Sequence, residues 1–341
     1  MLGRRGVRLA VVVAIAFALA PGATAGAQSS YRVLEIGPVP GFDSIGGDDI
    51  NASGQVVGNV QAGTFGERSA FVWDPSSGLR VLGRFAGEAT FAGGINDSGV
   101  VAGVAGGGHV YFPGTAFRWT AAGGFESLGS TGTPTDINNA GVVVGYSLGP
   151  AWVRWGANGQ VQPFDQRIYG GPNAINDGGQ IVGDVQGIGP AVIFDPQTGL
   201  GELPLFPGGL RASANDINDQ GHATGVADVP YTTKRKDTTP CGLRATSCAV
   251  IWRDGRPTAV GPNFSFGNGI NNSDHVVGQF LTGVDTGSST YHAFLYRNGV
   301  FSDLNQLVPA GTPLLEQARA INDAGWILAN SQGRAFVLIP R

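Results

Sequence analysis

The sequence is poor in the residues that helical proteins and nucleic-acid-binding proteins use most. Only 13% of its 341 residues are charged, one is methionine, and lysine occurs only at Lys234 and Lys236. Glycine and proline number 57 and 20, and inside a helix they cost roughly 1 and 3 kcal/mol each relative to alanine. These features exclude a helix-rich fold, and the formal charge of -4 disfavours non-specific binding to nucleic acid.

The hydrophobic content excludes wholesale disorder. Hydrophobic residues make up 42% of the chain, which is enough to bury a core. Beyond the N-terminal segment, no apolar run approaches the roughly 18 residues that indicate a membrane-spanning helix. We therefore expect a folded, loop-rich, all-β protein.

The first 27 residues have the pattern of a secretory signal. Three arginines before residue 9 form a basic region, residues 9–20 are apolar but too few to cross a bilayer, and Ala25-Gly26-Ala27 offers a cleavage site. We expect residues 1–27 to be removed and the protein to act outside the cytoplasm, in the periplasm or beyond. Both the general and the twin-arginine export routes remain open.

Cysteine occurs twice, at Cys241 and Cys248. In an oxidising compartment such a pair is expected to form a disulfide. Metal binding is the alternative, but the other ligands that a zinc site needs are absent from the neighbouring sequence.

One turn motif occurs seven times. Each copy begins with Ile-Asn, continues with two turn-forming or small residues, and ends in Gly, except that the sixth copy ends in Asp274. Asn can accept a backbone hydrogen bond within the turn, and Gly supplies the positive φ that closes a hairpin. Asp tolerates that conformation less well, so we expect the sixth hairpin to be the most strained. The copies begin at Ile50, Ile95, Ile137, Ile175, Ile217, Ile270 and Ile321.

The spacing of the copies, 38 to 53 residues, is typical of a four-stranded propeller blade. The strand that ends in the turn, strand a, is followed by a Val-Val-Gly strand b, an aromatic strand c such as Ala70-Phe71-Val72-Trp73, and a short strand d. The last copy lacks strand d, and residues 31–37 at the other end of the chain have its character. The sequence therefore predicts one domain over residues 31–341, a seven-bladed β-propeller with four antiparallel strands per blade, closed by an N-terminal strand that completes the last blade.

The sixth repeat carries a family resemblance. Residues 292–304 read His-Ala-Phe-Leu-Tyr-Arg-Asn-Gly-Val-Phe-Ser-Asp-Leu, and an Ala-Ile-Asn-Asp-Ala-Gly turn follows at 320–325. This pattern resembles the HAF-repeat family of extracellular bacterial proteins, and the resemblance extends over residues 31–341, although only the sixth copy keeps the histidine. It implies an exported β-repeat protein and supplies no catalytic residues.

The predicted strand order separates two faces of the ring. The a–b and c–d connections are short and uniform and lie on one face, the turn face, whereas the b–c and d–a connections vary and lie on the other, the loop face. Variable loops on a rigid scaffold commonly carry binding. The longest loop, the insertion at 226–248, contains Tyr231, Lys234, Arg235 and Lys236, which we predict as binding residues. A solvated basic loop tip is the plainer interpretation.

Aspartates near the end of strand a are candidates for a cation site. Asp49, Asp136 and Asp216, together with Asp48, precede the Ile-Asn turns and could face the axis. The alternative is that they satisfy backbone groups or solvate the channel, because the sequence has no calcium-loop spacing. No cofactor is expected, and the sequence has no nucleophile, zinc or nucleotide motif.

Three functions remain open from the sequence. The first is a secreted, monomeric propeller that binds a glycan or a cell-surface protein through the loop face. The second is a propeller enzyme acting on a polysaccharide, which would need converging carboxylates and has only the strand-a aspartates to offer. The third is a structural surface protein that packs against copies of itself.

Overall fold

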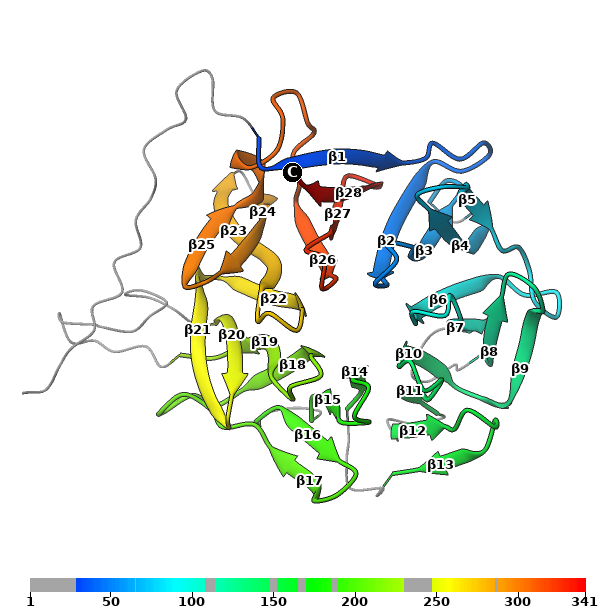
Figure 1. Ribbon diagram of the computed structural model, residues 1–341, viewed down its shortest axis with the longest axis horizontal. Helices are drawn as coiled ribbons and strands as arrows, with labels where there is room; N and C mark the ends of the chain where they lie inside the picture. The colour runs from blue at the N-terminus through cyan, green and yellow to red at the C-terminus, as the bar shows by residue number, and fades with distance from the viewer. Residues whose placement is uncertain are drawn as a thin grey trace, which may run out of the picture.

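The computed structural model describes residues 29–64, 66–107, 114–147, 152–164, 170–185, 189–229, 247–285 and 288–341. These residues form seven four-stranded antiparallel sheets around a central axis (Figure 1). The predicted seven-bladed propeller is confirmed. Within these ranges, no helix has the length and apolar character needed to cross a membrane.

Each blade runs from an innermost strand a to an outer strand d. Blades 1 to 4 consist of β2 (Ser44–Ile50), β3 (Val56–Gln61), β4 (Arg68–Asp74) and β5 (Gly78–Val81); β6 (Thr90–Ile95), β7 (Val101–Ala105), β8 (Thr115–Thr120) and β9 (Gly124–Thr131); β10 (Thr133–Ile137), β11 (Val143–Tyr146), β12 (Trp152–Trp155) and β13 (Val161–Pro163); and β14 (Pro172–Ile175), β15 (Ile181–Gly183), β16 (Val192–Asp195) and β17 (Gly199–Glu202). Blades 5 and 6 consist of β18 (Ala212–Ile217), β19 (Ala223–Ala227), β20 (Cys248–Arg253) and β21 (Arg256–Asn263); and β22 (Ser265–Ile270), β23 (Val276–Asp285), β24 (Ser288–Arg297) and β25 (Val300–Asp303), followed by the 3-10 turn η1 (Leu304–Gln306).

Blade 7 joins the two ends of the described chain. Its strands a, b and c are β26 (Gln317–Ile321), β27 (Ile327–Ser331) and β28 (Arg334–Pro340), and its outer strand is β1 (Tyr31–Ile36). β1 pairs with β28 antiparallel along its whole length. The predicted closure by an N-terminal strand is therefore confirmed.

The aromatic strands c form the core between blades. The aromatic residue at the centre of strand c is almost fully buried in blades 1, 2, 6 and 7, at Phe71, Phe117, Phe294 and Phe336. In blade 3 a tryptophan takes the preceding position, which is alanine in the other blades. Trp152 packs there against Gly183 of blade 4, where an added Cβ would lie 2.6 Å from the indole ring. The tryptophans of strand c are thus core residues.

Every strand a contains a β-bulge just before the Ile-Asn turn. A bulge adds one unpaired residue and re-aims its side chain. The bulge residues are Asp48, Gly93, Thr135, Asn173, Asn215, Asn268 and Arg319. All seven bulge residues line the central cavity, and six of them have a side chain.

The sixth hairpin adopts the strained conformation that the sequence predicts, but its neighbours support it. Asp274 has φ +58°, and its carboxylate accepts hydrogen bonds from Asn218 Nδ2 (3.0 Å), His222 Nδ1 (2.9 Å) and Arg253 Nε (2.6 Å) of blade 5. Burial acts to raise the pKa of Asp274, but the bonds from His222 and Arg253 outweigh it and the pKa lies below its usual value. The unusual turn residue is therefore a contact between blades.

Candidate functional site

The seven turn asparagines close a ring of hydrogen bonds around the axis. Each side chain donates from Nδ2 to the backbone carbonyl of the turn asparagine in the next blade, at 2.9 to 3.2 Å, and the last bond returns from Asn322 to Asn51. Each Oδ1 accepts the N–H four residues further on. The asparagines are only 4 to 6% exposed. Both the nitrogen and the oxygen of every side-chain amide therefore already form hydrogen bonds within the protein.

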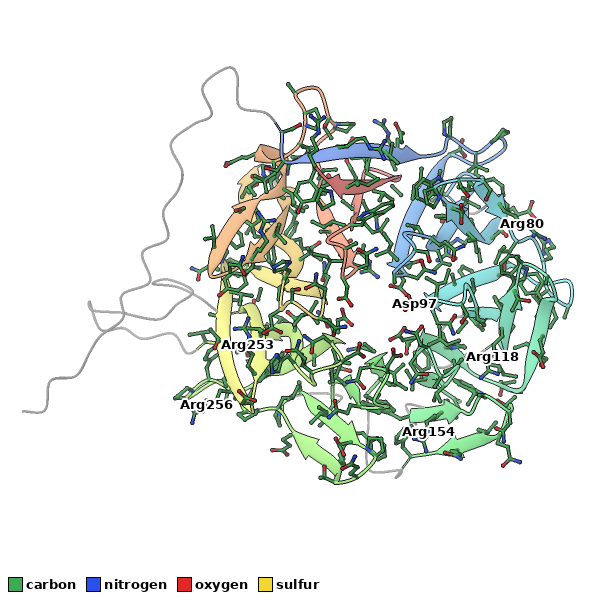
Figure 2. All side chains as sticks on the ribbon, viewed as in Figure 1. Arg80, Asp97, Arg118, Arg154, Arg253 and Arg256 are labelled. Atoms are coloured by element: carbon green, nitrogen blue, oxygen red, sulfur yellow. The ribbon has the colours of Figure 1, made fainter. Side chains whose placement is uncertain are left out.

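A second, exposed ring surrounds the mouth of the channel on the turn face. The residue after each turn asparagine offers a side-chain oxygen to the backbone N–H of the equivalent residue in the preceding blade, at 2.8 to 3.0 Å. Its members are Asp97, Asn139, Asp177, Asp219, Asn272 and Asp323, and Ala52 interrupts it. Asp97 lies at the edge of the central opening in Figure 2. These side chains also serve the contacts between blades.

The predicted cation-site residues Asp49, Asp136 and Asp216 belong to alternate blades. In each, one carboxylate oxygen accepts the N–H of the following isoleucine and the other accepts the isoleucine N–H of the next blade, at 2.7 to 2.9 Å. The contacts of these aspartates therefore agree with the alternative that they satisfy backbone N–H groups. Among the described residues, no three His, Cys, Asp or Glu side chains are grouped so that they could hold a metal ion, and the cation site stays a prediction.

The same three carboxyls have raised pKa values. Burial raises the pKa of Asp216 to about 7, against the two backbone hydrogen bonds that lower it. Burial also raises the pKa of Asp49 and of Asp136, and the charge of Asp49 adds to the effect at Asp136. The channel wall thus contains one carboxyl group, that of Asp216, that can gain a proton near neutral pH.

Amides and a hydroxyl at the bulge positions join blades 3 to 7. Asn173, Asn215 and Asn268 donate from Nδ2 to the carbonyls of Ala214, Gly267 and Ala318 of the following blades, at 2.7 to 2.8 Å. Thr135 donates in the same way to the carbonyl of Pro172 at 2.8 Å. In these four blades the bulge residue is thus a connector between neighbours.

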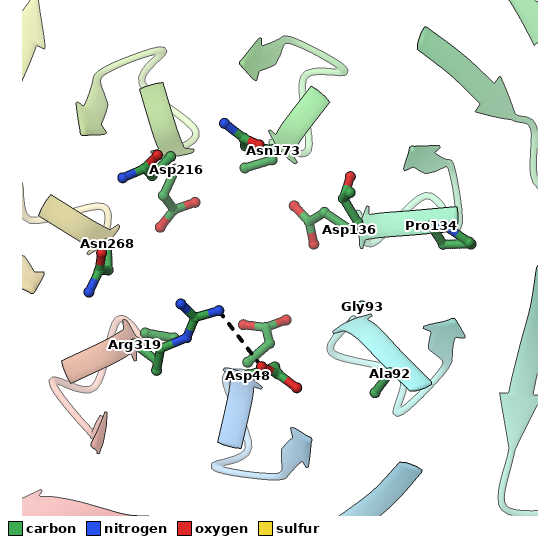
Figure 3. A pocket seen from close by; sticks show the side chains of 14 residues that line it. Asp48, Ala92, Gly93, Pro134, Asp136, Asn173, Asp216, Asn268 and Arg319 are labelled. Atoms are coloured by element: carbon green, nitrogen blue, oxygen red, sulfur yellow. Dashed lines mark ion pairs between the residues drawn. The ribbon is translucent and has the colours of Figure 1, made fainter. Parts of the chain in front are cut away.

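The two remaining side chains at the bulges are charged and lie in adjacent blades. Arg319 of blade 7 lies beside Asp48 of blade 1 on the wall of the central cavity, with Nη2 3.7 Å from Oδ1 (Figure 3). The contacts to the next blade are made instead from strand b. Asn330 exchanges two hydrogen bonds with the backbone of Gly47, and Asn59 accepts the N–H of Ala92 while donating to Asp48.

The central cavity around this pair has a volume of about 460 Å³. Its wall combines Arg319, the aspartates and the bulge amides. Burial raises the pKa of Asp48 to about 6, against the charge of Arg319 and the hydrogen bond from Asn59. The cavity is polar, and Arg319 is its one cationic side chain among the described residues.

A second hollow of about 470 Å³ opens on the loop face between blades 6, 7 and 1. Its lining includes Gln279, Tyr291, Glu316, Gln317 and Gln332, together with Ser44 to Gly46. We call it the seam hollow. A Cβ added to Gly46 would meet nothing within 4 Å, so the inner strand of blade 1 leaves space at this point.

The sequence analysis missed most of the seam hollow. Residues 279–292 of blade 6 are predicted from the sequence as one of the variable b–c connections, but Gln279 and Tyr291 lie in β23 and β24. Glu316 and Gln317 carry no sequence signal, because three blades must come together to form the cavity. The predicted binding residues Tyr231, Lys234, Arg235 and Lys236 lie outside the described residues, as does Cys241. Cys248 begins β20 and is fully buried, and its disulfide with Cys241 stays a prediction.

Comparison with known proteins supports the fold at low sequence identity. No family model matches the chain, and no curated protein matches its sequence. A streptogramin B lyase structure is similar, with a TM-score of 0.57, 11% identity, and coverage of 92% of this chain and 100% of that one.

Two further structures are similar along their whole length. A virginiamycin B lyase from Staphylococcus aureus has a TM-score of 0.56 and 10% identity, covering 91% of this chain and 100% of that one. YCF48 bound to D1 peptide has a TM-score of 0.53 and 10% identity, covering 97% of this chain and 100% of that one. At such identities the comparisons show that the chain has the β-propeller fold.

Proposed function

We propose that the protein is a secreted recognition protein that binds a glycan through the loop face. The seam hollow carries this proposal. Its amides supply both donors and acceptors, its single carboxylate supplies a strong acceptor, and Tyr291 supplies an aromatic ring with a polar end. A concave site with a few convergent polar groups suits a ligand rich in hydroxyl groups.

The difference between the polar side chains of the turn face and those of the loop face supports a binding site on the loop face. On the turn face the seven buried asparagines and the ring around the mouth use their side chains in contacts between blades. The seam hollow instead presents the side chains of Gln279 and Gln317, which form no hydrogen bond to any described residue. Groups of this kind can exchange water for a ligand without breaking the fold.

Thermal-shift and calorimetric titrations with neutral oligosaccharides test the proposal, because a ligand that binds only the folded state raises its stability. We expect Tyr291→Ala and Gln317→Ala each to weaken binding about tenfold, the effect of losing one good polar or aromatic contact. Gln197→Ala, in an exposed c–d turn on the turn face, is the matched control and should bind as the wild type does. Glycan binding that survives both seam-hollow variants, or is lost in the control, would contradict the proposed site.

A protein partner is the other outcome of this test. One similar structure, YCF48, is described in complex with a peptide, so a propeller of this kind can bind a polypeptide segment. Failure of all oligosaccharides to bind, with capture of a cell-surface protein that Tyr291→Ala releases, would replace the glycan by a protein.

A polysaccharide-acting enzyme is the second candidate function. The observation in its favour is that two carboxyls of the central cavity, Asp48 and Asp216, have pKa values raised to about 6 and about 7, as acid–base catalysis requires. The similar lyase structures show that the fold can carry enzymes. Both Asp216 oxygens already accept backbone hydrogen bonds, which is why this candidate stands second. Product analysis after incubation of the wild type and of Asp48→Asn with polysaccharides tests this candidate. Turnover by the wild type that is lost in the variant would favour the enzyme function over the binding function.

Export can be tested separately. We propose that the protein is secreted and that Cys241 and Cys248 are joined in the insertion. Mass spectrometry of the protein recovered from the producing cell's exterior, digested without reduction, should find the two cysteine peptides linked. Recovery of full-length chain only from the cytoplasm would contradict this part of the proposal.

A further inference from the structure

The side chains of the charged bulge residues Arg319 and Asp48 do not form the hydrogen bond to the next blade that the bulge residues of blades 3 to 6 form. In blades 3 to 6 the bulge side chain donates to a carbonyl of the next blade. In blades 7 and 1 the contact to the next blade comes instead from Asn330 and Asn59, which occupy equivalent positions on strand b. Asn330 donates to the Gly47 carbonyl, whereas Asn59 accepts the N–H of Ala92. The side chain that connects to the next blade thus comes from strand b in the two blades whose bulge residues are charged.

The pair itself adds little to stability. Its closest atoms are 3.7 Å apart, which is too long for a hydrogen bond, and the two side chains are 38% and 29% exposed. An ion pair of this kind contributes between 0 and about 1 kcal/mol. Arg319 donates no hydrogen bond to any residue in the described part of the chain, so its guanidinium N–H groups remain available inside the cavity.

The pair lies on the same two strands as the seam hollow, nearer to the turn face. Gly46 and Gln317 line the hollow, and Asp48 and Arg319 line the central cavity two residues further along β2 and β26. At about 3.3 Å per residue this is a step of roughly 7 Å, comparable with one sugar residue. The open space beside Gly46 borders the seam hollow on the strand that carries Asp48.

We infer that Arg319 and Asp48 form a second subsite that continues the seam hollow and binds neighbouring hydroxyl groups of the next sugar residue along the glycan. A guanidinium donates two parallel hydrogen bonds and a carboxylate accepts them, so the pair matches a vicinal diol. The inference rests on the proposed function and adds the ligand class: an extended neutral oligosaccharide. Acidic glycans are disfavoured because four carboxyl groups, those of Asp48, Asp49, Asp136 and Asp216, line the same cavity as Arg319, which is its one cationic side chain in the described part of the chain.

Isothermal titration with the disaccharides and tetrasaccharides of the cello-, xylo-, manno- and chito- series tests the inference. In the wild type, the tetrasaccharide of the recognised series should bind about tenfold more tightly than the disaccharide, because it reaches the second subsite. Arg319→Gln and Asp48→Asn should bind the disaccharide with wild-type affinity and lose the gain in affinity for the tetrasaccharide. Arg319→Lys keeps the positive charge but lacks the paired N–H donors of the guanidinium, and it should keep part of that gain.

Two controls keep the outcomes distinct. Arg256→Gln removes an exposed arginine at the outer rim (Figure 2) and should retain the full gain with length. Unfolding midpoints of all variants establish that they are folded, and unchanged disaccharide affinity shows that the seam hollow is intact. If Arg319→Gln and Asp48→Asn keep the gain, the second subsite is overturned while the proposed function stands. If no series binds to the wild type, the proposed function fails and the inference with it.

Discussion

The two faces of the ring use polar side chains for opposite purposes. On the turn face, equivalent asparagines in all seven blades bond to one another, and their regularity comes from a repeated structural requirement. On the loop face, polar side chains from three blades surround a hollow and differ from one blade to the next. Repetition in this protein therefore marks stability, and departure from repetition marks the places where a ligand can be recognised.

The largest test of this contrast is Asn138→Ala in the buried ring. The substitution removes the acceptor of the Val142 N–H and the donor to the Asn176 carbonyl, and leaving such groups unsatisfied should lower the free energy of unfolding by about 3 kcal/mol. Denaturant unfolding measures the loss. Asn158→Ala, in an exposed c–d turn, should lose less than about 1 kcal/mol, and equal losses in the two variants would remove the special role of the ring.

The channel carboxyls predict a smaller, pH-dependent effect. Because the folded pKa of Asp216 is raised to about 7, its contribution to stability is fully present below the pKa of the unfolded chain and is lost as the pH rises through about 7. Stability should therefore decline over this interval, and Asp216→Asn should make the decline shallower. Thr135→Val is the control, because it changes a residue of the same cavity that does not titrate, and it should retain the wild-type slope whatever its absolute stability. An unchanged slope in Asp216→Asn would contradict the raised pKa.

The supported hairpin of blade 6 should show the reverse dependence on pH. The lowered pKa of Asp274 means that its contribution is present above the pKa of the unfolded chain and is lost as the pH falls through the folded value. Asp274→Asn keeps a residue that tolerates positive φ but removes the charge that faces His222 and Arg253. We expect it to lower the free energy of unfolding by about 1 kcal/mol at neutral pH, and the difference from wild type should vanish in acid. A difference that persists in acid would show that the charge is not its source.

The smallest effect is expected for an ion pair on the loop face. Arg334, at the start of β28, makes two hydrogen bonds to Glu35 of β1, and both side chains are more than one-third exposed. Arg334→Gln should change stability by less than about 1 kcal/mol, because six backbone-paired positions already join these strands. A loss as large as that of Asn138→Ala would contradict the assignment of stability to the turn face.

The repeat made the fold predictable from the sequence. Each Ile-Asn turn contains both the isoleucine that ends strand a and the asparagine that bonds to the next blade, so local chemistry and ring assembly coincide in the same residues. The missing seventh strand d likewise pointed to β1. The strain at Asp274 was also predictable, because positive φ is a property of one residue.

The candidate site was less predictable because its parts are distant in sequence. Arg319 and Asp48 meet only after the ring closes, and the bulge that turns them towards the channel leaves no sequence signal of its own. The compensating residues Asn59 and Asn330 can be recognised only when equivalent positions of all blades are compared in space. The aspartates of strand a line the central cavity, but the backbone N–H groups from which they accept hydrogen bonds belong partly to other blades.

The closed asparagine ring also bears on how such a chain can arise. Every blade contributes one donor to the blade after it and one acceptor to the blade before it, so a duplicated blade brings a complete connector of its own. A gene segment encoding one unit could thus be copied in tandem without any matching change in its neighbours. Divergence could then accumulate in the loops while the connector was kept, which is the distribution of similarity that the seven repeats display.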